Sequence, residues 1–230
     1  MSYPGSKGQA GTFQRIIGQM PPHTVYVEPF LGSGQVFWRK RPAQESLLND
    51  LSPGVIAKAS AAVRNANFNV DGHPTVCISN RDALDWLSLL NPVADAVIYC
   101  DPPYLLSTRQ GRFYYEHEMT EGDHRRLLAL LQGMKCRVLL SGYPSQLYSS
   151  QLQTWRCISY RTRTRGRTVT ECLWCNFPEP TELHDWRYAG KNFRQRLSFK
   201  RLAARWLARL YVMPPLKRNY LLNTIVQRQK

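Results

Sequence analysis

The sequence predicts an α/β fold with a mostly parallel, doubly wound sheet, an antiparallel edge hairpin and a basic helical extension. Three observations support this prediction. Short apolar runs alternate with helical patterns from residue 25 to residue 141, which is typical of a parallel sheet covered by helices. Residues 155–164 and 168–177 then form two strand-like runs joined at Arg165-Gly166. Residues 185–230 combine helical periodicity with an excess of bases.

The apolar runs place the individual elements. We expect buried strands at 25–28, 47–50, 75–78, 94–100 and 137–141. We expect one helix that begins at Gln35 and three further helices at 55–63, 82–90 and 124–131. The last of these has a capping-box signature, because Thr120 stands three residues before Asp123. In the extension, apolar residues recur every three or four positions from Phe199 to Leu210, which predicts an amphipathic helix that ends at Pro214-Pro215 and precedes a second short helix.

The charge of the chain is high and unevenly distributed. Lys and Arg number 31 against 16 Asp and Glu, a net charge of +15. Residues 1–184 carry nineteen bases and fifteen acids, net +4, whereas residues 185–230 carry twelve bases and one acid, net +11. We therefore expect a catalytic domain at 1–184 and a basic α-helical extension at 185–230. Such a charge favours a polyanionic partner, which at this point includes DNA, RNA and an anionic membrane surface.

The location of the protein follows from two missing signals. No apolar run reaches the roughly 18 residues of a membrane span. Met1–Lys7 lacks the apolar run of a signal peptide. We expect a cytoplasmic protein with no membrane partner.

The six cysteines do not form a metal-binding pattern. Cys172 and Cys175 form a CxxC, but on a strand they would point to opposite faces, and no second pair has the spacing of a zinc site. We expect buried free thiols and no metal.

The first chemical motif is a glycine turn after the first strand, Glu28-Pro-Phe-Leu-Gly-Ser-Gly34. Glycines allow backbone to approach a ligand closely. The turn lacks the lysine of a phosphate-binding loop, and the carboxylate of Glu28 favours a cationic or hydroxylated ligand instead. A plain tight turn is the structural alternative.

Two further acids follow the next two strands. Asp50 ends the second strand, where an acid commonly accepts hydrogen bonds from ribose hydroxyls. Asp82 follows the third strand and could accept a hydrogen bond from an adenine amine. A solvated turn at Asp50 and a helix N-cap at Asp82 are the structural alternatives.

The most specific signal is Asp101-Pro-Pro-Tyr104 at the end of the fourth strand. Open α/β sheets bind ligands at this edge. A carboxylate and a backbone carbonyl can accept the two N–H groups of a planar base, while the tyrosine ring stacks on its face. The alternative is a rigid proline turn with a core tyrosine.

Four motifs occur in order: Tyr3-Pro-Gly-Ser-Lys7, the glycine turn, Asn49-Asp50 and Asp101-Pro-Pro-Tyr104. Together they resemble the Dam-like DNA adenine-N6 methyltransferases. Later runs, among them His117-Glu-Met-Thr120 and Thr170-Glu-Cys-Leu-Trp-Cys-Asn176, are similar to a compact phage and prophage branch. The resemblance covers roughly residues 2–178.

The resemblance implies a Rossmann-like, mixed seven-stranded sheet that uses S-adenosylmethionine and releases S-adenosylhomocysteine. It assigns the cofactor to Tyr3, Lys7, Glu28, Phe30, Gly32, Gly34, Asp50, Asp82 and Asp101. It assigns the flipped target adenine of double-stranded DNA to Asp101, Pro102, Pro103 and Tyr104. The open alternatives are methylation of RNA adenine or of DNA cytosine N4, and a non-catalytic DNA-binding protein on a vestigial fold.

Alternating arginines are the candidate DNA contacts. Residues i and i+2 of an extended hairpin share a face, so a row of guanidiniums could line one edge. The candidates in the hairpin are Arg161, Arg163, Arg165 and Arg167, and those in the loop after Asp101-Pro-Pro-Tyr104 are Arg109 and Arg112. Solvated surface arginines are the alternative.

Only residues 51–100 separate the Asn-Asp motif from Asp101, so a target-recognition insertion is small or absent. We therefore expect the DNA sequence specificity to be low, or to be determined by another part of the chain.

Overall fold

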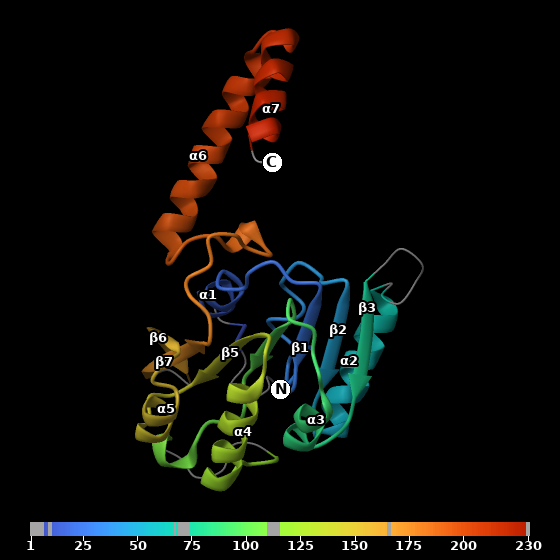
Figure 1. The fold of residues 1–230 in the computed structure, drawn as a ribbon, viewed down its shortest axis with the longest axis vertical. Coiled ribbons are helices and arrows are strands. Elements are labelled where there is room, and N and C mark those ends of the chain that lie inside the picture. Colours follow the sequence, from blue (N-terminus) through green and yellow to red (C-terminus); the bar gives the residue numbers. More distant parts are fainter. Residues whose placement is uncertain are drawn as a thin grey trace. The chain divides into compact units, whose positions relative to one another are not determined.

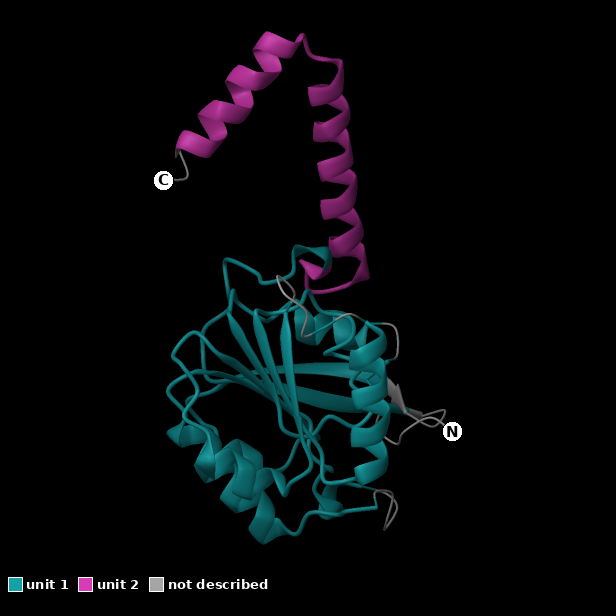
Figure 2. Ribbon diagram, turned by 90° about the vertical axis from the view of Figure 1, so that its right-hand side faces the viewer, with its two compact units in different colours: residues 1–187 teal, residues 188–230 magenta. Residues whose placement is uncertain are grey.

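The protein is described by a computed structural model that covers residues 7–8, 11–66, 68, 74–109, 116–164 and 167–228. The chain divides into two compact units (Figure 2). The first unit ends at Arg187 and the second begins at Tyr188. Each unit is described by itself.

The first unit is built on a seven-stranded sheet within the described residues (Figure 1). Its strands are β1 (Val25–Glu28), β2 (Glu45–Asn49), β3 (Thr75–Ser79), β4 (Val97–Cys100), β5 (Arg137–Gly142), β6 (Arg156–Thr164) and β7 (Arg167–Cys175). The strand order is β3-β2-β1-β4-β5-β7-β6. The first five strands are parallel, and β7 runs antiparallel to both β5 and β6. The expected Rossmann-like mixed sheet with an antiparallel edge hairpin is therefore confirmed.

Helices cover both sides of this sheet (Figures 1 and 2). They are α1 (Thr12–Ile17), α2 (Pro53–Asn65), α3 (Ala83–Leu89), α4 (Glu121–Gly133) and α5 (Gln146–Gln151). The capping box predicted for α4 is present, since Thr120 and Asp123 each accept a hydrogen bond from the backbone of the other. The helix predicted to begin at Gln35 is wrong. That segment forms consecutive turns, and Pro42 disfavours helical backbone at Arg41, which prevents a helix from continuing past it.

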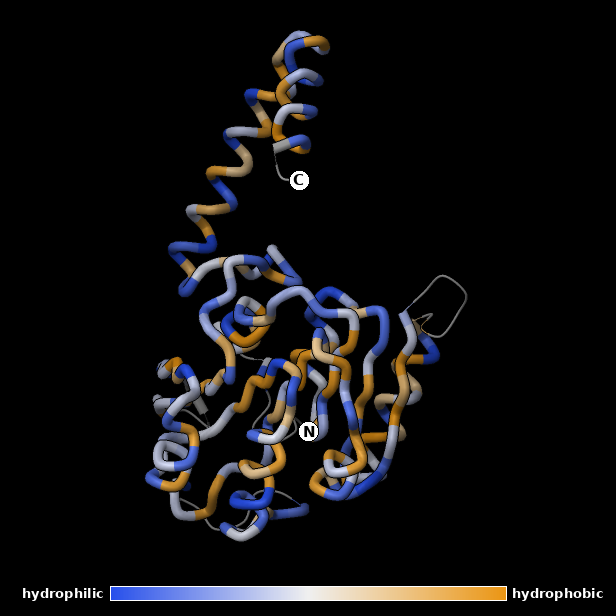
Figure 3. The backbone as a smooth tube through the Cα atoms, viewed as in Figure 1, coloured by the Kyte–Doolittle hydropathy of each residue, from blue (hydrophilic) through white to orange (hydrophobic). Residues whose placement is uncertain are grey.

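Alternation along the central strands separates an apolar face from a polar one. One face carries Val27, Ile98, Leu140 and Trp174, which join α3, α4 and α5 in a single buried cluster. Hydrophobic residues recur along these strands in Figure 3. Because successive side chains of a strand point to opposite faces, the intervening residues face the other way.

The intervening residues include a set of buried polar side chains that we call the polar row. Its members are Tyr26, Glu28, Tyr99, Ser141, Tyr160 and Glu171, and all are buried. They are hydrogen-bonded in pairs. The Tyr26 hydroxyl donates to Glu28 at 2.8 Å, and the Tyr160 hydroxyl donates to Glu171 at 3.1 Å. The hydroxyls of Tyr99 and Ser141 are 3.1 Å apart. These pairings satisfy groups whose burial would otherwise be costly.

The second unit contains α6 (Phe193–Val212) and α7 (Pro215–Arg228). The amphipathic helix predicted from the spacing is confirmed as α6. Its N-cap is Asn192, whose Oδ1 accepts a hydrogen bond from Gln195 N. The second helix is longer than the short one expected. No helix in the described part of the chain is long and apolar enough to cross a lipid bilayer.

All six cysteines are free thiols, as predicted. The expectation that all six would be buried is wrong for Cys77 and Cys157. These two are exposed because each lies on an edge strand of the sheet.

We predict that His124 makes the fold sensitive to acid. It is fully buried with Nδ1 2.9 Å from the Tyr148 hydroxyl, and burial lowers the pKa of His124 from 6.5 to about 4. Between these values the unfolded chain binds a proton that the folded chain excludes, so stability falls as the pH drops through this window. The His124 contribution is about 3 kcal/mol. Unfolding free energies measured from pH 4 to 7 should show a shallower slope for His124→Gln than for wild type. An unchanged slope in that variant, with exposed His117→Gln as control, would refute the assignment.

A second prediction concerns the turn after β1. Gly34 has φ +61°, and a Cβ there would lie 2.6 Å from Trp38 Nε1. We expect Gly34→Ala to destabilise the protein by about 1–3 kcal/mol through backbone strain and this clash. Gly133→Ala is the control, because a Cβ at Gly133 meets nothing within 4 Å. Chemical denaturation of both variants checks the difference, and equal midpoints would contradict it.

Candidate active site

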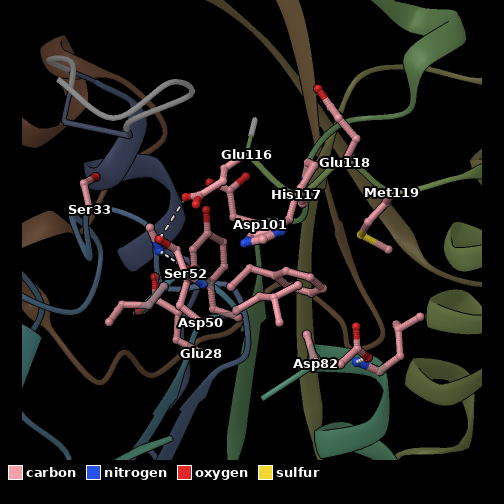
Figure 4. Close-up of a pocket in the computed structure, with 18 of the residues that line it drawn as sticks. Glu28, Ser33, Asp50, Ser52, Asp82, Asp101, Glu116, His117, Glu118 and Met119 are labelled. Carbon is pink, nitrogen blue, oxygen red and sulfur yellow. Dashed lines mark hydrogen bonds between the residues drawn. The ribbon is translucent and has the colours of Figure 1, made fainter. Parts of the chain in front are cut away.

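A pocket lies at the carboxyl ends of β1, β2 and β4 (Figure 4). It brings together eight of the residues singled out by the sequence: Lys7, Glu28, Phe30, Gly32, Asp50, Asp82, Asp101 and Pro103. Parallel strands end at one edge of the sheet, which is why residues far apart in sequence meet there. Gly34, Pro102 and Tyr104 do not line the pocket. Tyr3 lies outside the described residues.

The glycine turn is held against the end of β2. Gly32 N donates to Asp50 Oδ2 at 2.7 Å, and Leu31 N donates to the Asn49 carbonyl at 2.9 Å. Gly32 borders the pocket, as expected for close approach of a ligand. Gly34 does not: the space beside it is filled by Trp38, so packing rather than a ligand explains this glycine.

Asp50 is a buried acid with two backbone donors. Ser52 N donates to Oδ1 at 2.9 Å, in addition to the Gly32 contact on Oδ2. Burial nevertheless raises the pKa of Asp50 above its ordinary value. The structure thus fixes the orientation of this carboxylate at the mouth of the pocket.

Asp82 forms the helix N-cap that the sequence offered as the structural alternative, and it also lies in the pocket lining. Its Oδ1 accepts hydrogen bonds from Leu84 N at 2.9 Å and Asp85 N at 3.0 Å, so Asp82 is the N-cap of α3. The same residue lines the pocket (Figure 4). Both capping contacts use Oδ1. Oδ2 could therefore bind a ligand without disturbing the cap.

Sequence reasoning missed one wall of the pocket, residues 116–119. Glu116, His117, Glu118 and Met119 all line it. Ser52 Oγ donates to Glu116 Oε2 at 3.1 Å, which ties this segment to the end of β2 (Figure 4). The segment has no helical or strand periodicity, so only its acidic composition and the family resemblance of His117-Glu-Met-Thr120 could have indicated this placement.

Arg109 is oriented differently from the exposed DNA contact that was expected. Its side chain is only 5% exposed and forms a two-pronged ion pair with Glu118, with Nη1 3.0 Å from Oε1. The arginine therefore fixes the 116–119 wall, because a buried guanidinium requires such a partner. Arg112 lies outside the described residues.

The pocket is acidic although the protein is strongly basic. Seven carboxyl residues line it: Glu28, Asp50, Asp82, Asp101, Glu116, Glu118 and Asp123. The basic side chains in the lining are Lys7 and His117. Burial raises the pKa of Glu28 to about 8. Within the described ranges, no three His, Cys, Asp or Glu side chains converge as metal ligands. The lining is suited to a positively charged organic ligand.

Asp101 and Tyr104 meet at Lys7. The Lys7 ammonium nitrogen lies 2.8 Å from Asp101 Oδ1 and 4.8 Å from the centroid of the Tyr104 ring. The Tyr104 ring is buried and packs edge-to-face on Tyr143 at 4.6 Å. The motif is thus a rigid, partly buried corner, with a cation on the acceptor and near the ring.

The arginine hairpin is only partly in the expected arrangement. Arg161 is exposed on β6. The register pairs position 163 with Thr168 and Thr164 with position 167, so position 167 does not share a face with positions 161 and 163. Arg165 lies outside the described residues.

Comparisons with known proteins agree with this description. The model of the family described as D12 class N6 adenine-specific DNA methyltransferase matches residues 3–92, which contain the first three of the four motifs. No curated protein matches the chain.

Several solved structures are similar to the chain. Magnesium protoporphyrin IX methyltransferase from Synechocystis is 14% identical, with 72% of this chain and 75% of that one covered and a TM-score of 0.46. An rRNA methylase from Streptococcus thermophilus is 10% identical, with 71% and 90% covered and a TM-score of 0.44. Precorrin 8w decarboxylase from Methanobacterium thermoautotrophicum is 12% identical, with 77% and 94% covered and a TM-score of 0.46.

These structures carry different activities in their names, and a shared fold does not define a substrate. The family match is more specific, because its range contains part of the pocket lining, although Asp101 and residues 116–119 lie outside it. The match over residues 3–92 supports the placement of this chain among the Dam-like DNA adenine-N6 methyltransferases, and with it S-adenosylmethionine-dependent methylation.

Proposed function

We propose that the protein transfers a methyl group from S-adenosylmethionine to N6 of adenine in double-stranded DNA, with the target base turned out of the helix. One observation carries the proposal. The Asp101 carboxylate already forms an ion pair with a nitrogen cation, Lys7 Nζ at 2.8 Å from Oδ1, in the lining of a pocket suited to a cation. An acceptor for an amine thus adjoins a site for a positively charged methyl donor.

The pocket residues fit this cofactor. S-adenosylmethionine carries a sulfonium and an ammonium, and the ionised carboxylates among the seven acidic lining residues favour such charges. The same lining would repel the phosphates of a nucleotide. Asp50 would hold the ribose hydroxyls, Asp82 the adenine amine and Glu28 the cationic end. When bound, the cofactor supplies an electrophilic methyl group.

The chain's own groups prepare the target amine. Asp101 and a backbone carbonyl of the motif would accept the two N–H groups of N6, which shifts the nitrogen from planar toward tetrahedral and exposes its lone pair. Tyr104 would contact the face of the base. The proton leaves after methyl transfer, when the nitrogen is far more acidic, so Asp101 acts chiefly by orienting and accepting.

A base within a duplex cannot reach this corner, so it must be extruded at a cost of a few kcal/mol. Contacts between basic side chains and phosphates would offset that cost. Arg161 is exposed on the edge hairpin and is the best-defined candidate, and Arg163 follows two positions later on β6. RNA adenine and DNA cytosine N4 also present an exocyclic amine, and they are outcomes of the test below.

The direct test of the proposal is Asp101→Ala. We expect roughly a 100-fold or greater loss of methyl transfer, because the amine loses its orienting acceptor, while cofactor binding persists through the rest of the pocket. DNA treated with each enzyme is digested to nucleosides and analysed by mass spectrometry, and cofactor binding is measured by calorimetry. Asp85→Ala is the control, since Asp85 is exposed on α3 and lies outside the pocket lining. Wild-type activity in Asp101→Ala would defeat the assignment, and N4-methylcytosine or methylated RNA would redirect it.

The contribution of Arg161 can be measured through salt. We predict that Arg161→Ala weakens DNA binding on all sequences and reduces the log–log salt slope by about 0.9, the value for one phosphate contact. Arg64→Ala removes the same charge from an exposed position on α2 and should leave the slope unchanged. Fluorescence anisotropy across a range of salt concentrations gives both slopes. If the two variants behave alike, Arg161 does not contact the backbone.

A further inference from the structure

The corner expected to receive the target base is already occupied by Lys7. Its ammonium forms an ion pair with Asp101, with Nζ 2.8 Å from Oδ1, and lies 4.8 Å from the centre of the Tyr104 ring. A nucleobase whose amine binds Asp101 and whose ring contacts Tyr104 needs the same two positions. The side chain of Lys7 is only 6% exposed, so solvent does not offer it an easy alternative.

A second carboxylate lies on the same face of the sheet. Asp101 follows Tyr99 by two residues, and the Tyr99 hydroxyl meets Ser141. Ser141 pairs with Leu173 on β7, and Glu171 precedes Leu173 by two residues. Side chains two apart on a strand share a face, so Glu171 belongs to the same side as Asp101.

Tyrosine packing connects the two acids. Tyr104 packs on Tyr143, which directly follows β5, and Tyr160 is the register partner of Glu171 on β6. The Tyr160 hydroxyl donates to Glu171 Oε2 at 3.1 Å. The register therefore places Glu171 and its partner Tyr160 on the face of the sheet that carries Tyr99 and Ser141.

Glu171 has the properties of a second acceptor for a cation. It is 6% exposed, and a carboxyl group at that depth needs hydrogen bonds or a counter-charge. Burial raises the pKa of Glu171, and Lys7 is the largest influence in the opposite direction, ahead of the Tyr160 and Tyr104 hydroxyls. The charge of Lys7 therefore favours the ionised form of Glu171, while its ammonium pairs with Asp101.

We propose that Lys7 holds the base site closed in the free enzyme and moves from Asp101 toward Glu171 when a substrate amine docks on Asp101, which makes Glu171 a positioning residue for base entry. The identity of the incoming amine rests on the proposed function. The lysine remains charged throughout, so no proton is gained or lost. Without Glu171, the substrate would have to compete with an ion pair that has nowhere else to place its cation.

The test compares charge with shape at position 171. Glu171→Gln keeps the shape and removes the charge, whereas Glu171→Asp keeps the charge and shortens the side chain. We expect kcat/KM for DNA to fall roughly 10- to 100-fold in Glu171→Gln, with the KM for S-adenosylmethionine within about threefold of wild type, and Glu171→Asp to retain more activity. A purely structural role predicts the reverse order, because the isosteric variant would then be better tolerated.

A double-mutant cycle with Lys7→Met isolates the proposed route. Fluorescence of 2-aminopurine at the target position reports base extrusion, and it should fall in Glu171→Gln. In the Lys7→Met background the same substitution should change extrusion by less than about threefold, because the cation that Glu171 receives is gone. An equal effect of Glu171→Gln in both backgrounds would overturn the proposal.

Two controls keep the outcomes separate. Asp185→Asn removes a buried carboxylate that binds Arg187 and Arg41 N, away from the pocket, and should lower stability without a selective effect on DNA. The product of the wild-type reaction is identified by mass spectrometry. A methylated base other than N6-methyladenine would contradict the proposed function. The double-mutant cycle of Lys7 and Glu171 would still test the present proposal, with extrusion of that other base as the measured quantity.

Discussion

The period of two along the β-strands governs both the stability and the chemistry of the first unit. It sends Val27, Ile98 and Leu140 into the apolar cluster beneath α3, α4 and α5. The same alternation gives the polar row to the other face, where its members satisfy one another in pairs. Because both faces are buried, the strands cannot shift by one residue without exchanging apolar and polar contacts, so the register that stabilises the fold also positions Asp101.

Charge is separated within the molecule in a way that matches two different ligands. The chain carries a net charge of +15, and yet its main pocket is lined by seven carboxyl residues. A basic surface favours a polyanion, whereas the acidic lining favours a small cation and disfavours phosphate. The acidic wall is held by protein contacts, with Glu118 fixed by Arg109 and Glu116 by Ser52. Under the proposed function, this charge separation would keep the cofactor and the nucleic acid apart before any chemistry takes place.

Sequence reasoning predicted the parts of the site that obey local rules. Asp50, Asp82 and Asp101 follow strands that apolar runs identify, and the common edge of parallel strands brings them together. It could not place residues 116–119, which have no periodicity, or Glu171, whose role depends on the β5–β7 register. It also misjudged Gly34 and Arg109, because the contacts with Trp38 and Glu118 are set by packing rather than by spacing.

In the proposed function, the corner formed by Asp101 and Tyr104 receives an exocyclic amine beside an acidic pocket that holds the cofactor. The decisive experiment is a crystal structure of the protein with a non-reactive cofactor analogue and an adenine-containing duplex. We expect an unpaired adenine with N6 within hydrogen-bonding distance of an Asp101 carboxylate oxygen and the analogue against Glu28 and Asp50. A duplex whose bases all remain stacked, or an analogue bound outside this pocket, would contradict it.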